Sequence, residues 1–126
     1  MSSTKTILVV DDEPGLRQVL QATLAAPEFA IAQAGSGAQA LILARQLQPA
    51  LIILDLQLTP EHPNGLEVCR ELKNDPALAG TRILMLTGSH WPENRDAAEA
   101  AGADYFFTKP FSPRTLLDRI YNVLFG

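Results

Sequence analysis

The sequence predicts an α/β fold with a parallel five-stranded sheet, and three observations support this prediction. Short, continuous apolar runs alternate with helical stretches along the 126 residues. Such runs are typical of strands buried on both faces of a parallel sheet, and strands that alternate with helices indicate βα units. Four of the runs lead into polar residues where the strand should end. In open parallel sheets this carboxyl end is where ligands bind.

The expected elements follow in order. The strands are predicted at Ile7–Val10, Ala30–Ala34, Leu51–Leu54, Ile83–Leu86 and Tyr105–Phe107. The helices are predicted from Pro14 to the stop at Pro27, at 38–48, at 66–74, between 92 and 101, and from Ser112-Pro113 onward. Prolines mark most of these boundaries, because proline suits the first helical turn and cannot continue a helix interior.

Helical spacing predicts which side chains face the sheet. They are Leu16, Val19, Leu20, Thr23 and Leu24 in the first helix, and Leu41, Leu43, Ala44 and Leu47 in the second. Asn64 and Ser112 are expected N-caps, and Gly102 suits the position after the fourth helix. The single cysteine, Cys69, excludes an internal disulfide and is expected to pack in the core.

Length and charge limit the possible functions. The chain is long enough for one domain with its own core, and its net charge of −4 argues against a basic surface for nucleic acid. Its apolar runs are too short to span a bilayer, and Met1 leads into a strand without a signal segment. We therefore expect a cytoplasmic protein with a genuine N-terminus that contacts neither DNA by itself nor a membrane.

The polar residues at the strand ends should meet at one edge of the sheet. They are Asp11 and Asp12, Asp55, Thr87 and Lys109. Three clustered carboxylates repel one another, so either their pKa values rise or a cation lies between them. A hard divalent ion such as Mg²⁺ suits carboxylate oxygens and waters, and it also binds phosphate groups. Taken alone, Lys109 would be a surface lysine and Asp11-Asp12 a complement to a helix N-terminus.

Together these residues resemble a response-regulator receiver domain of two-component signalling. The resemblance is carried by Asp11-Asp12, Asp55, Thr87-Gly88 and Lys109-Pro110-Phe111, each following the expected strand, and it covers the whole chain. It implies a single receiver domain over residues 1–126. It also implies a doubly wound, flavodoxin-like (βα)5 sheet with strand order 2-1-3-4-5 and helices on both faces.

The resemblance further implies a set of roles. Asp55 is the phosphorylation site, and the Mg²⁺ ligands are Asp12, Asp55 and the main-chain carbonyl of Gln57, with Asp11 acting through water. Mg²⁺ and Lys109 neutralise the phosphoryl group during transfer. Such a protein is a phosphoacceptor that assists its own phosphorylation and dephosphorylation, and not an enzyme in the usual sense.

The resemblance also implies a switch. The Thr87 hydroxyl and the Gly88 amide turn toward the new phosphoryl group, and Phe106 fills the space that Thr87 leaves, while Tyr105 points to the other face. The implied donor is a histidine kinase or phosphotransfer protein. The output partner is unknown, with a homodimer through the fourth helix, fifth strand and fifth helix as one option. Tyr105, Arg114, Asp118 and Arg119 are the candidate contact residues.

One region departs from the family pattern, and several alternatives stay open. Proline and glycine usually follow the aspartate by four and eight residues, whereas Pro60 and Gly65 follow Asp55 by five and ten. A phosphatase of the haloacid-dehalogenase type would have Asp where Gln57 stands, and an FMN carrier would not place acids at its phosphate loop. A receiver that binds partners without phosphorylation remains the main competitor. His62 and His90 are too few for a zinc centre.

Overall fold

The structure, a computed structural model, describes residues 4–56, 64–88, 92–109 and 111–126. Five parallel strands form one sheet in the order β2-β1-β3-β4-β5, which confirms the predicted order. The strands are β1 (Lys5–Val10), β2 (Phe29–Ala34), β3 (Leu51–Asp55), β4 (Arg82–Thr87) and β5 (Tyr105–Thr108). The helices are α1 (Pro14–Thr23), α2 (Gly37–Leu47), α3 (Gly65–Lys73), α4 (Pro92–Ala100) and α5 (Pro113–Phe125). A short 3-10 turn, η1 (Pro76–Leu78), was not predicted from the sequence.

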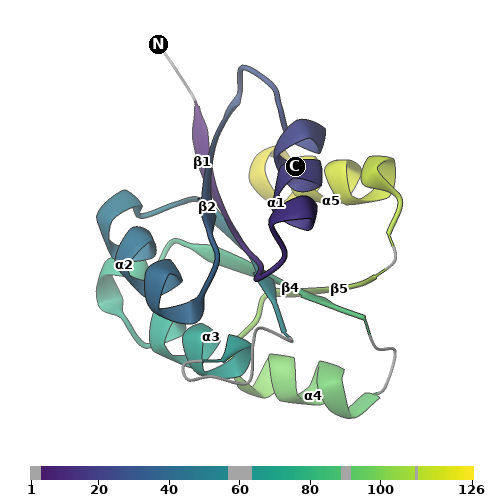
Figure 1. The fold of residues 1–126 in the computed structure, drawn as a ribbon. Coiled ribbons are helices and arrows are strands. Elements are labelled where there is room, and N and C mark those ends of the chain that lie inside the picture. Colours follow the sequence, from purple (N-terminus) through teal and green to yellow (C-terminus); the bar gives the residue numbers. More distant parts are fainter. Residues whose placement is uncertain (1–3, 57–63, 89–91, 110) are drawn as a thin grey trace.

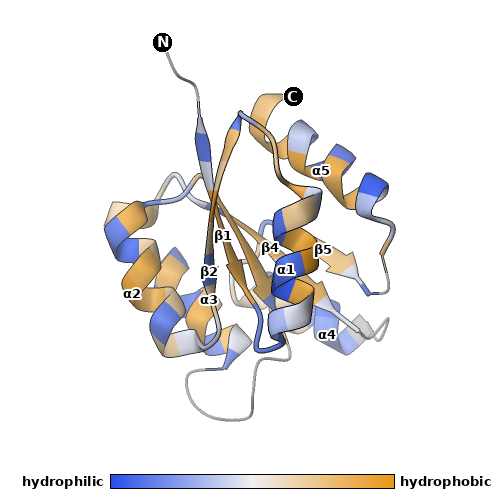
Figure 2. Cartoon of the chain, turned by 45° about the horizontal axis from the view of Figure 1, so that its top comes forward, coloured by the Kyte–Doolittle hydropathy of each residue, from blue (hydrophilic) through white to orange (hydrophobic). Residues whose placement is uncertain are grey.

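The helices cover both faces of the sheet (Figure 1). Successive side chains of a strand point to opposite faces, so each strand supplies both layers of the core. In β1, Leu8 and Val10 pack on the side of α2, α3 and α4, whereas Ile7 and Val9 pack on the side of α1 and α5. The sheet and the inward helix faces form the apolar centre, with polar residues outside (Figure 2). The chain is thus a three-layer α/β sandwich.

Local signals fix the helix ends near the site. Asn64 and Glu67 form a capping box at the start of α3: the Glu67 amide donates to the Asn64 side chain and the Asn64 amide to the Glu67 carboxylate. This confirms the predicted cap. Gly102 follows α4 with a φ of 101°, which a residue with a side chain rarely adopts. Ser112 holds the N-cap position of α5, but its side chain makes no capping hydrogen bond.

The prediction that Leu47 and Val19 face the sheet is wrong. Leu47 is 42% exposed and Val19 is 49% exposed. In α2 the small residues Gly37, Ala40 and Ala44 are the buried ones, so the helix lies against the sheet through its least bulky stripe. Helix α1 also ends at Thr23, before the expected stop at Pro27. Cys69 is buried in α3 as predicted, and burial raises the pKa of its thiol to about 11.

The helices within the described ranges are short. None of them combines the length and apolar character needed to cross a lipid bilayer.

Candidate functional site

The acid pair lies directly after β1, and Asp11 is firmly held there. Its main-chain N–H donates to the carbonyl of Ala34 in β2 at 3.2 Å, and its carboxylate Oδ1 accepts from the Glu13 amide at 2.9 Å. The side chain is 1% exposed, whereas Asp12 is half-buried. The turn therefore buries one carboxylate and leaves the next one accessible from the edge of the sheet.

Asp55 is the last residue of β3 and is buried, with 4% of its surface exposed. In the sheet it pairs with Leu86, and the next amide, that of Leu56, donates to the Leu86 carbonyl at 2.7 Å. Helix α3 begins very close by. A Cβ atom on Gly65 would lie 2.5 Å from the main-chain oxygen of Asp55, so only glycine fits at that point. The backbone around Asp55 is thus fixed on two sides.

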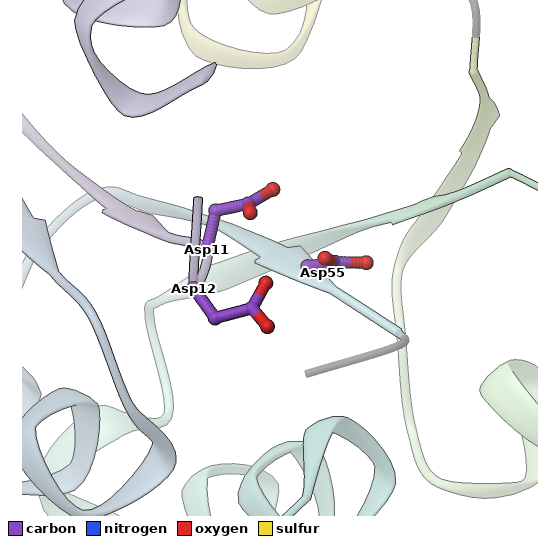
Figure 3. A group of neighbouring side chains, drawn as sticks. All are labelled: Asp11, Asp12 and Asp55. Carbon is purple, nitrogen blue, oxygen red and sulfur yellow. The ribbon is translucent and has the colours of Figure 1, made fainter. Parts of the chain in front are cut away.

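The structure brings the three predicted carboxylates together (Figure 3). Each of Asp11, Asp12 and Asp55 offers an oxygen, and these oxygens lie within 4.8 Å of one another. They reach this point from two neighbouring strands, β1 and β3, which pair in parallel with Val10 beside Leu54. Adjacent parallel strands end at the same edge of a sheet, which explains how residues far apart in sequence converge.

Lys109 reaches the same cluster from the end of β5. Its Nζ lies 3.4 Å from Oδ2 of Asp11 and 3.4 Å from Oδ2 of Asp55. Its main-chain amide donates to the Thr87 carbonyl at 2.6 Å, which ties it to the end of β4. Lys109 therefore pairs with two of the three carboxylates, and among the described residues the cluster of three acids and one ammonium keeps an excess of negative charge.

Two pKa shifts follow from this arrangement. Burial, together with the charge of Asp55, raises the pKa of Asp11, although the Glu13 amide and Lys109 oppose this. Burial alone would lower the pKa of Lys109, but attraction to Asp55 and Asp11 outweighs it and the pKa is raised. Asp11 is thus costly to ionise in the folded chain, and Lys109 stays charged at neutral pH.

The expected switch residues lie on the neighbouring strands. Thr87 is fully buried at the end of β4, and Gly88 follows it at the surface. Phe106 pairs with Met85 and packs on the side of α2, α3 and α4, while Tyr105 packs on the opposite side, as predicted. The guanidinium of Arg95 in α4 lies over the Phe106 ring, 5.8 Å from its centre. Gln57, Pro60, His62, His90 and Pro110 lie outside the described residues.

The comparisons with known proteins identify the family. A family model described as the response regulator receiver domain matches residues 7–121. The chain belongs to this family. It is 40% identical over 114 residues to the DNA-binding response regulator MtrA of Mycolicibacterium smegmatis, which covers 90% of this chain and 48% of that protein. It is 37% identical over 120 residues to the phosphate regulon transcriptional regulatory protein PhoB of Pseudomonas aeruginosa, covering 95% of this chain and 52% of that protein.

The solved structures agree with this assignment. The chemotaxis response regulator CheY4 of Vibrio cholerae superposes with a TM-score of 0.86 at 31% identity, covering 95% of this chain and 98% of that one. The receiver domain thus spans about half the length of the curated relatives it matches but nearly all of CheY4. Membership of this family decides against the haloacid-dehalogenase and FMN-carrier interpretations.

The residues of this receiver domain fit a divalent metal ion. Among the residues that the structure describes, the donor set consists of carboxylate oxygens without sulfur or imidazole, which suits a hard cation such as Mg²⁺. The half-buried Asp12 gives such an ion access from solvent.

Sequence reasoning missed one residue that touches this site. The side chain of Arg17 in α1 donates from Nη1 to the main-chain carbonyl of Asp11 at 2.6 Å. Its acceptor is a backbone atom, so residue types alone did not point to the contact. The sequence signal that could have pointed to it is a basic residue, Arg17, about one helical turn after the consecutive acids Asp11, Asp12 and Glu13.

Proposed function

We propose that this receiver domain is a phosphoryl-accepting signalling switch, with Asp55 as the acceptor. The observation that carries the proposal is the meeting of Asp11, Asp12 and Asp55 beside a single lysine at the carboxyl edge of the sheet. The excess negative charge calls for a cation, and a buried carboxylate at a strand end is held in one orientation for attack. The proposed domain comprises residues 1–126.

Four groups of this chain would hold Mg²⁺. Asp12 and Asp55 would bind it directly, the Gln57 carbonyl would add a third ligand, and Asp11 would act through a water molecule. When bound, the ion supplies charge neutralisation for the incoming phosphoryl group. Lys109 contributes the second positive charge, because its Nζ already lies 3.4 Å from Oδ2 of Asp55.

The transfer itself needs little beyond positioning. A carboxylate oxygen of Asp55 attacks phosphorus, a P–O bond forms, and the bond from phosphorus to the donor breaks. With a phosphohistidine donor the P–N bond breaks and the imidazole leaves with the electron pair. We propose a histidine kinase or phosphotransfer protein as this donor. The chain is a phosphoacceptor, and it assists hydrolysis of its own acyl phosphate by the same charge neutralisation.

Phosphorylation would then act on the face formed by α4, β5 and α5. The Thr87 hydroxyl and the Gly88 amide would bind the phosphoryl oxygens, and Phe106 would move deeper as Thr87 shifts. A groove of about 190 Å³ lies on this face, lined in part by Arg95, Phe106 and Arg119. Tyr105 also lines it and is half-buried, so less of this predicted contact residue is accessible than of the exposed residues on α5.

This face would bind the output partner or a second copy of the chain. Arg114, Asp118 and Arg119 lie on the exposed side of α5 and would contribute polar contacts. MtrA is named as DNA-binding, but this chain carries a net charge of −4, so we propose no direct contact with nucleic acid. We also propose cytoplasmic residence, where kinases of this kind present their phosphohistidine.

A receiver that binds partners without being phosphorylated is the alternative. The complete acid cluster and the doubly paired lysine favour the phosphorylated switch. The deciding experiment mixes the protein with acetyl phosphate and Mg²⁺ and measures the intact mass. One added phosphoryl group, absent when EDTA replaces Mg²⁺, supports the proposal, and an unchanged mass in both samples contradicts it.

A further inference from the structure

Arg17 connects helix α1 to the turn that carries the acid pair. Its side chain is half-buried, and it makes two hydrogen bonds through different nitrogens. Nη1 donates to the main-chain carbonyl of Asp11 at 2.6 Å, and Nε donates to Oε1 of Gln33 in β2 at 3.2 Å. One rigid guanidinium therefore joins the end of β1 to the edge strand β2.

The carbonyl that Arg17 holds belongs to the peptide between Asp11 and Asp12. The other polar groups of Asp11 are also occupied: its amide by Ala34, Oδ1 by the Glu13 amide, and Oδ2 by Lys109. Rotation of this peptide about its neighbouring bonds would redirect the Asp12 side chain. The Arg17 hydrogen bond opposes that rotation from the carbonyl side.

The surroundings of Arg17 keep its guanidinium in place. A Cβ atom on Gly35 would lie 3.2 Å from Nη1, so even an alanine there would press on the guanidinium. The side-chain amide nitrogen of Gln33 also donates to the Gln21 side chain. This hydrogen bond orients Oε1 of Gln33, which accepts from Arg17 Nε. Lysine cannot reproduce this arrangement, because a single ammonium lacks the planar fork that reaches two acceptors in fixed directions.

We propose that Arg17 is a positioning residue for the metal site: it fixes the Asp11–Asp12 peptide so that the Asp12 carboxylate stays directed at the cluster with Asp55. This inference rests on the proposed Mg²⁺-dependent function. The charge of Arg17 by itself would act in the opposite direction, because a cation near the site repels Mg²⁺. If Arg17 is replaced by a neutral residue, a positioning role predicts weaker Mg²⁺ binding, whereas simple electrostatics predicts tighter binding.

The test measures Mg²⁺ affinity of the purified chain by calorimetry, with Arg17→Met, Arg17→Lys and Gly35→Ala as variants. Arg17→Met should weaken Mg²⁺ binding about tenfold, in the range seen when partners of metal ligands are removed. Arg17→Lys, which keeps the charge, should weaken it by a smaller factor, and Gly35→Ala should do so by displacing the guanidinium. Arg45→Lys is the matched control, because Arg45 pairs with Asp75 at the surface of α2 and should leave the affinity unchanged.

Phosphorylation by acetyl phosphate gives a second readout. In Arg17→Met the Mg²⁺ concentration for half-maximal rate should rise about tenfold, whereas the rate at saturating Mg²⁺ should return close to that of wild type. Urea unfolding separates this from a merely structural role, which would lower stability and leave Mg²⁺ affinity unchanged. If Arg17→Met fails to fold, Arg17→Lys and Gly35→Ala carry the same test.

The outcomes distinguish this inference from the function on which it rests. A wild-type chain that binds no Mg²⁺ overturns the proposed function, and the role of Arg17 with it. A wild-type chain that binds Mg²⁺ normally, with equal or tighter binding in Arg17→Met and unchanged binding in Arg17→Lys, overturns the role of Arg17 alone.

Discussion

The two ends of the sheet hold their acidic residues differently. At the amino ends of the strands, Asp104 contacts Lys73 and the start of β4. At the carboxyl ends, Asp55 and Asp11 share Lys109. Asp104 Oδ2 accepts from Lys73 Nζ at 2.9 Å and from the Ile83 amide at 2.8 Å. The ion pairs of Lys109 are longer, at 3.4 Å, and are divided between two carboxylates. At the amino end, one carboxylate oxygen of Asp104 therefore has two hydrogen-bond donors.

The difference separates two uses of a carboxylate. At the amino end the acid connects α3, β4 and β5 and contributes to stability, because its Oδ2 accepts from both the Lys73 ammonium and the Ile83 amide. At the carboxyl end three acids lie within 4.8 Å with one ammonium, so the fold keeps a repulsion that a bound cation would relieve. Residues that cost stability without a ligand are common at functional sites.

The largest expected effect tests the acceptor itself. Asp55→Asn removes the nucleophile while nearly conserving side-chain volume, so it should abolish acyl phosphate formation and leave the fold intact. Intact mass after treatment with acetyl phosphate and Mg²⁺ measures the first effect, and circular dichroism the second. Phosphate incorporation at the wild-type level in this variant would remove Asp55 from its assigned role.

The next largest effect concerns the metal. Asp12→Ala removes a proposed direct ligand from the accessible side of the cluster, and Mg²⁺ affinity should fall at least about tenfold. Calorimetric titration measures it. Asp75→Ala, which removes an acid near the other end of the sheet, is the control and should bind Mg²⁺ as wild type does. Equal affinity in the wild type and Asp12→Ala would contradict the ligand role.

Stability should separate the two ends of the sheet most directly. Asp104→Ala leaves Lys73 and the Ile83 amide without their partner, and should lower the free energy of unfolding by about 1–2 kcal/mol. Asp12→Asn should leave that free energy unchanged or raise it in metal-free buffer, because it removes one repelling charge. Urea unfolding of both variants in EDTA measures this. Equal losses would mean that the carboxyl-end acids are as structural as Asp104.

Much of this comparison could be predicted from the sequence, and the missing parts have physical reasons. The strand ends at Asp11 and Asp55 were visible because apolar runs and polar ends are local patterns. The pair between Lys73 and Asp104 was not, since it joins residues 31 positions apart whose contact depends on how α3 packs. The contact of Arg17 with a main-chain carbonyl was hidden for a related reason, because any residue has a carbonyl. The exposure of Leu47 was missed because spacing alone did not show that Ala40 and Ala44 bring α2 onto the sheet.

A smaller effect should link the carboxyl end to the α4–β5–α5 face. Phosphorylation, or beryllofluoride with Mg²⁺, should change amide signals or hydrogen exchange at Thr87, Phe106 and α4 more than along α1. The reason is that Phe106 packs beside β4 and under Arg95 of α4. A ligand shifts such an equilibrium only by its preference for one state, so part of the change can exist beforehand. Changes confined to the surroundings of Asp55 would mean that this face does not switch.

The smallest expected effect is a pH dependence of stability in the metal-free protein, caused by Asp11. Because burial and the Asp55 charge raise its pKa in the folded state, the folded chain holds this proton more tightly than the unfolded chain does. The resulting stabilisation is fully present below the unfolded pKa near 3.8 and is lost as pH rises through the folded pKa. Asp11→Asn has no such titration, and its amide oxygen can still accept from Glu13. Its stability relative to wild type should therefore increase from pH 4 to pH 7, measured by urea unfolding in EDTA. A constant difference between Asp11→Asn and wild type across this range would show that Asp11 carries no buried-charge cost.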